Sequence, residues 1–78
     1  MNLYRFYFTD IEKPISIEAY TKKSARMKLQ QVIISLESKG YFLENLIKET
    51  VEELIDGVSE KTSNGINYVW KNNQWRKS

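Results

Sequence analysis

The chain contains no cysteine, and for 78 residues this is the strongest constraint on how it can fold. A chain of this length buries only about 60% of its unfolded surface, so its core is small. Without cysteine, no disulfide framework can supplement that core. We therefore expect one compact domain over residues 1–78, held together by hydrophobic packing and of modest stability.

Histidine is absent as well, and the two absences together restrict the chemistry. Ser–His and Cys–His nucleophiles cannot form, and neither can zinc sites built on thiolate or imidazole ligands. Only an all-oxygen site for Mg²⁺ or Ca²⁺ would remain, and no EF-hand spacing occurs. An enzyme using Glu52 and Asp56 with a divalent ion is the least favoured hypothesis. We expect a non-enzymatic protein without metal or cofactor.

No part of the sequence resembles a membrane span or a signal peptide. There is no run of about 18 apolar residues, and residues 1–5 lack the charged and apolar regions of a leader. We expect a cytoplasmic protein with no membrane contact.

The first forty residues predict two strands and a helix. Residues 3–8 and 15–20 are short, alternating and rich in aromatic and β-branched side chains, so they are expected to pair as an antiparallel hairpin. Thr21 is a suitable N-cap for a helix over residues 22–38. Gly40 is suited to end that helix in a left-handed conformation.

A second helix is predicted over residues 43–56, closed by Gly57, because apolar residues recur there at three- and four-residue spacing. An alternative places a strand at residues 42–48 and begins a helix at a capping box formed by Thr50 and Glu53. The apolar positions behind the helical prediction are Leu43, Leu46, Ile47, Thr50, Val51, Leu54, Ile55 and Val58.

The C-terminal segment predicts a hairpin. Residues 66–71 and 74–77 flank Asn72-Asn73, which suits a two-residue type I′ turn because asparagine tolerates positive φ. Residues 59–65 are expected to be a loop. This hairpin pairs Trp70 with Trp75 on one face, which makes the tryptophans core residues rather than exposed base-stacking groups. The expected fold is α+β, a two-layer sandwich of order ββααββ, with both hairpins in one antiparallel sheet and the helices on one face.

The net charge of +2 conceals an uneven distribution. Residues 1–40 carry seven basic and four acidic groups, residues 41–60 one basic and six acidic, and residues 61–78 four basic and none acidic. The segment charges of +3, −5 and +4 favour a partner of complementary charge. The basic segments suggest nucleic-acid binding as an alternative function. The plain interpretation of the same residues is a solvated, lysine-rich surface. The candidate residues are Arg5, Tyr7, Tyr20, Lys22, Lys23, Arg26, Lys71 and Arg76.

Two further features suggest a protein partner. Met27 and Ile34, beside Gln31, lie opposite the apolar face expected to be buried in the first helix. Acidic residues would form a ridge along the second helix. The alternative interpretation of this ridge is a solvated helix face without a partner. We expect a small protein that binds another protein or itself as a homodimer. A regulator or inhibitor from a phage or mobile element fits the size and the lysine- and asparagine-rich composition. The expected contacts are Met27, Gln31, Ile34, Glu49, Glu52, Glu53 and Asp56.

Overall fold

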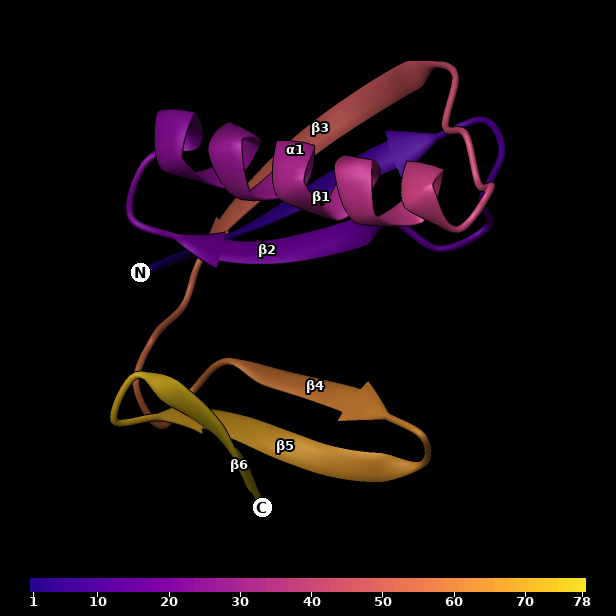
Figure 1. Cartoon of the computed structure of the whole chain (residues 1–78). Coiled ribbons are helices and arrows are strands. Elements are labelled where there is room, and N and C mark those ends of the chain that lie inside the picture. The colour runs from indigo at the N-terminus through magenta and orange to yellow at the C-terminus, as the bar shows by residue number, and fades with distance from the viewer.

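The computed structural model describes all residues 1–78 and has the predicted α+β composition, arranged differently (Figure 1). One helix and two separate three-stranded antiparallel sheets replace the predicted two helices and single sheet, so the ββααββ sandwich is wrong. The elements are β1 (Asn2–Phe8), β2 (Ile15–Ala19), α1 (Lys22–Ser38), β3 (Leu46–Glu53), β4 (Glu60–Ser63), β5 (Ile66–Lys71) and β6 (Gln74–Lys77).

The first sheet has the order β2-β1-β3 and carries α1 on one face. Alternation along β1 directs Tyr4, Phe6 and Phe8 to that face, where they form the main core with Ala25 and Leu29 of α1. Phe6 is completely buried. The predicted first hairpin is confirmed, since β1 pairs with β2 from Asn2 to Phe6.

Both predicted ends of α1 are confirmed. The Thr21 hydroxyl accepts a hydrogen bond from the Ser24 N–H at 3.1 Å, which satisfies one of the unpaired donors of the first turn. At the other end, Gly40 has φ of +86°, and the N–H of Tyr41 bonds the Leu36 carbonyl at 2.9 Å. This is a Schellman ending, which needs a left-handed residue at the position of Gly40.

The predicted helix over residues 43–56 is wrong, and so is its alternative of a strand at 42–48 before a helix. The segment instead contributes β3, which pairs antiparallel with the whole of β1. β1 is buried on the helix side, and the backbone groups on its second edge need partners. Pairing with β3 supplies them, and this tertiary requirement overrides a helical period that local sequence alone favours.

The second sheet has the order β4-β5-β6. The hairpin of β5 and β6 is confirmed, with Asn72 and Asn73 at φ of +53° and +59° and Trp70 opposite Trp75. The loop predicted over 59–65 is wrong because β4 forms there. The turn Asn64-Gly65, with φ of +52° and +78°, joins β4 to β5, and an Asn-Gly pair is a strong hairpin signal.

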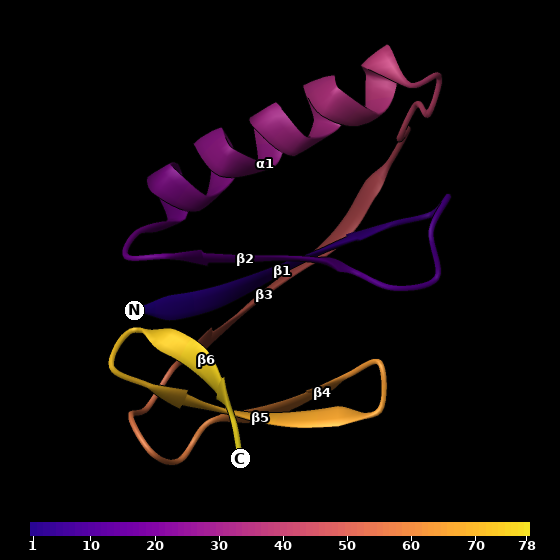
Figure 2. The ribbon, with the colours of Figure 1, turned by 60° about the horizontal axis from the view of Figure 1, so that its bottom comes forward.

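The second sheet lies against the face of the first sheet opposite α1, as a third layer (Figure 2). Leu3, at the start of β1, points to the sheet face away from α1 and forms a small second core with Leu54 and Trp70. The Trp75 Nε1 donates a hydrogen bond to the Glu18 carboxylate at 2.7 Å across the junction. The only helix is not long and apolar enough to cross a membrane.

Candidate functional site

The free edge of β3 is the most distinctive surface of the molecule. β3 is the outermost strand of the first sheet and is eight residues long, and no other strand pairs with its far side. α1 packs mainly over β2, so the helix face of β3 stays largely uncovered. An open edge strand presents unpaired N–H and C=O groups on which another strand can pair.

Apolar side chains accompany this open edge. Leu46, Ile47 and Val51 of β3 are 45%, 64% and 59% exposed. Ile47 lies at a bulge, because the pairing with β1 shifts between Tyr7 and Phe8. Exposed apolar residues gathered along one edge are typical of an interaction surface rather than of scattered surface positions.

A groove between α1 and β3 extends this surface onto the helix face. It has a volume of about 320 Å³ and an apolar lining from Leu29 and Ile33 of α1, Leu46 of β3 and Phe6 beneath them. Arg26 and Gln30 form its polar rim. We call the β3 edge and this groove together the β3 surface.

The acidic residues do not form the predicted ridge. In a strand, successive side chains alternate between faces, so Glu49 and Glu53 lie on the helix face and Glu52 lies on the opposite face. Glu49 accepts a hydrogen bond from Arg26 at 3.0 Å and forms an ion pair with Lys22 at 3.8 Å.

The other two predicted acidic residues do not lie on the sheet face that carries α1. Glu52 pairs with Arg5 at 2.8 Å on the opposite face of the first sheet. Asp56 lies beyond β3 and accepts a hydrogen bond from the Asn72 N–H at 2.8 Å. No group of three or more acidic side chains is placed so that it could hold a metal ion.

The apolar residues predicted on the back of α1 are exposed but separate from the β3 surface. Met27 is 64% and Ile34 51% exposed, and Gln31 is exposed beside them. At 100° per residue they lie roughly opposite Ala25 and Leu29, which face the sheet. The predicted partner-binding residues therefore form two separate groups. One group lies on the solvent side of α1, and the other lies on β3 and in the turn that follows it.

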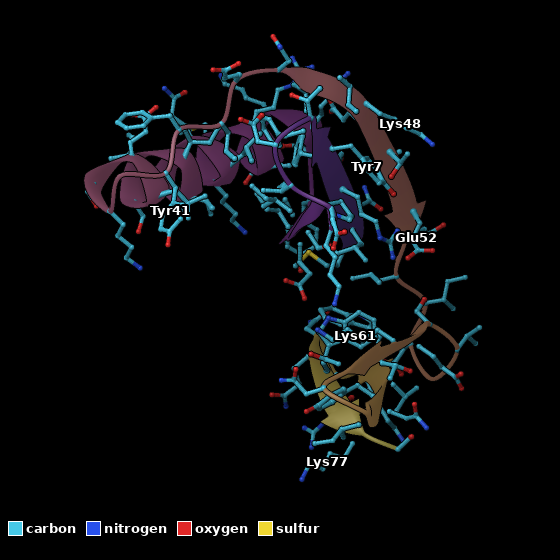
Figure 3. The ribbon with its side chains drawn as sticks, turned by 90° about the vertical axis from the view of Figure 1, so that its right-hand side faces the viewer. Tyr7, Tyr41, Lys48, Glu52, Lys61 and Lys77 are labelled. Carbon is cyan, nitrogen blue, oxygen red and sulfur yellow. The ribbon has the colours of Figure 1, made fainter.

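The basic residues proposed for nucleic acid are dispersed, and several are paired. Arg5, Lys22 and Arg26 have carboxylate partners, as described above. The Lys48 ammonium lies 5.4 Å from the Tyr7 ring centre, on the sheet face away from α1 (Figure 3). Tyr20 and Lys23 are exposed near the start of α1.

Lys71 and Arg76, the remaining candidates, lie on the second sheet. Their side chains alternate with Trp70 and Trp75, so they occupy the face opposite the tryptophans that contact the first sheet. Lys71 and Arg76 therefore do not share a sheet face with Arg5 and Tyr7, because the two hairpins belong to different sheets.

A second concavity, of about 270 Å³, lies between the two sheets. Lys61 enters it and stacks over the Trp75 ring at 4.7 Å, and Arg5 and Glu18 line the first-sheet side. Figure 3 shows Lys61 directed from the second sheet toward the first. These charged groups already have partners within the chain, so the cleft resembles a structural junction.

Sequence reasoning missed the edge position of Leu46, Ile47 and Val51. It placed them among the buried residues of a helix, and the β-branched Ile47, Thr50 and Val51 were the available signal for a strand. A comparison of the chain with protein-family models, with curated proteins and with solved structures finds no match.

Proposed function

We propose that this chain is a non-enzymatic binding protein that acts through protein–protein contacts, with the β3 surface as its contact site. The observation that carries the proposal is an eight-residue edge strand whose apolar side chains are exposed beside an apolar groove. An added strand would find backbone partners along β3, and the groove would receive apolar side chains from it.

The charged group beside the groove is already paired within the chain. Arg26 and Gln30 form the polar rim, and the Arg26 guanidinium pairs with Glu49 at 3.0 Å. A partner strand therefore gains mainly from backbone pairing and apolar burial. Such a protein would act by occupying a partner's surface, as a regulator or inhibitor does.

Nucleic-acid binding is the second candidate and is supported less well. The exposed cations Lys23, Lys71 and Arg76 favour it. Against it, Arg5, Lys22 and Arg26 already pair with glutamates, so they contribute less to phosphate binding.

The test compares two valine substitutions that differ in position and little in exposure. Val51 on the β3 edge is 59% exposed and Val58, in the turn after β3, is 64% exposed. A glutamate at either position should leave the fold intact by circular dichroism, and only Val51→Glu introduces a charge that opposes strand addition.

The immobilised full chain would be incubated with a lysate of the source organism, with and without nuclease. We expect a bound protein that survives nuclease, is lost with Val51→Glu and is retained with Val58→Glu. Capture that disappears with nuclease would instead support the nucleic-acid alternative. Capture equally strong with both glutamate variants would show that the β3 surface is not the contact site.

A further inference from the structure

We infer that the β3 edge pairs with the β3 edge of a second copy of the chain, antiparallel and centred on Thr50. The inference rests on the proposed function, because it names the occupant of the proposed contact site. It is carried by the order of charged residues along β3, which is complementary to itself in one register.

The geometry of such a pair is fixed by symmetry. A two-fold axis perpendicular to the sheet joins two β3 strands antiparallel and keeps both α1 helices on the same face. Residues directly opposite one another then point to the same side of the joint sheet. Each copy contributes its three strands, and the only long free edge of the first sheet disappears.

The register follows from the charges. With Thr50 opposite Thr50 of the second copy, Lys48 lies opposite Glu52 in both halves of the interface, and Glu49 lies opposite Val51. Opposite charges directly across a strand pair are stabilising and like charges are destabilising.

Neighbouring registers lack this complementarity. Centring the pair on Lys48, Glu49 or Glu52 places that residue opposite its own copy, with like charges in contact. Centring it on Val51 places Glu49 opposite Glu53. Among registers centred on residues 48–52, only the Thr50 register avoids like-charge pairs.

The surroundings of the two charged residues suit this pairing. Lys48 lies over Tyr7 and Glu52 pairs with Arg5, both on the sheet face away from α1. Figure 3 shows Lys48 and Glu52 along β3 at the edge of the molecule in that view. The Glu52 side chain is 51% exposed, so it can accept a second cation.

Cross-linking tests the register directly, because the chain has no native cysteine. In the Thr50 register, Thr50→Cys brings two thiols to the Cα separation of a directly opposed pair, within the range of a disulfide. The matched control is Glu53→Cys on the same strand, whose two copies would lie six residues apart along it, on the order of 20 Å. We expect covalent dimer from Thr50→Cys under mild oxidation and little from Glu53→Cys.

Charge reversal tests the same register without cysteine. Lys48→Glu or Glu52→Lys alone creates two like-charge pairs, and either should weaken self-association on the order of 10- to 100-fold. An equimolar mixture of the two variants restores both opposite-charge pairs, so it should form a heterodimer. Sedimentation would measure association, and circular dichroism would show that each variant is folded.

Three results would overturn the inference: a chain that stays monomeric at millimolar concentration, equal cross-linking at the two cysteine positions, or no heterodimer from the mixture. If the chain is monomeric but lysate capture still depends on Val51, the self-pairing inference fails and the proposed function stands. In the Thr50 register Val51→Glu faces Glu49 of the second copy, a like-charge pair, so if this variant changes neither measurement, both fail.

Discussion

Replacing Leu3 by alanine tests whether the second sheet is held to the first by its small apolar junction. Leu3 is 5% exposed and packs with Leu54 and Trp70, the other two buried members of that cluster. Burying a leucine contributes about 1.5–3 kcal/mol, and Leu→Ala in a well-packed core costs about 2–5 kcal/mol including the cavity. The low end applies here, because Leu3 also lines the open cleft between the sheets and water can enter the space left behind. We expect a loss of about 2–3 kcal/mol.

Two spectroscopic probes would locate that loss. Both tryptophans lie in the second sheet, so their fluorescence reports its unfolding, whereas far-UV circular dichroism is dominated by α1 on the first sheet. In urea, Leu3→Ala should lower the fluorescence midpoint at least as much as the dichroism midpoint. In a thermal scan, a loss of this size corresponds to a Tm lower by roughly 10–20 °C.

The matched control is Val58→Ala, which removes apolar atoms from a side chain that is 64% exposed. Its effect on the unfolding free energy should stay within about 0.5 kcal/mol. A Leu3→Ala cost below about 1 kcal/mol, no larger than the control within error, would refute the reasoning and show that the second sheet is not anchored through Leu3.

Three further predictions concern single positions, each measured by urea unfolding. Thr21→Ala removes the cap that accepts from Ser24 and should cost about 1 kcal/mol, whereas an unchanged midpoint would show that the cap contributes nothing. Gly65→Ala should cost about 1–2 kcal/mol through its φ of +78° alone, because an added Cβ would meet no atom within 4 Å; a stabilised variant would contradict this. Ile34→Asp should change stability by no more than about 0.5 kcal/mol, since the side chain is 51% exposed, and unfolding would show that Ile34 is a core residue. If Ile34→Asp abolished self-association while Val51→Glu did not, the contact would lie on the solvent side of α1 and not on β3.

Local signals in the sequence were sufficient for about half of the fold. The first hairpin, the helix with both of its caps, and the turn at Asn72-Asn73 each depend on residues close together in the chain. Thr21, Gly40 and the asparagines act through their own backbone conformations or through neighbouring N–H groups. Such effects can be predicted without knowing what lies nearby in space.

The remaining elements depend on distant partners. The sequence of β3, Leu-Ile-Lys-Glu-Thr-Val-Glu-Glu, has no alternation, and the strand exists because the second edge of β1 needs a partner. The division into two sheets likewise depends on Leu3 meeting Leu54 and Trp70, both of which are about 50 positions or more away in the sequence. The Asn64-Gly65 turn is an exception among these elements. Its Asn-Gly signal is local, so the hairpin of β4 and β5 could have been predicted from the sequence.

The wrong prediction of a helix over residues 43–56 and the exposed apolar residues of β3 have the same physical origin. Apolar residues at three- and four-residue spacing form one stripe on a helix, but on a strand they fall on both faces and cannot all be covered from one side. α1 covers side chains of β2 and β1, and the second sheet covers the Leu3 end of the first sheet, so Leu46, Ile47 and Val51 are left exposed. No other element of residues 1–78 covers them. The apolar period that predicts a buried helix therefore becomes, in a strand, a reason to expect a partner at the β3 edge.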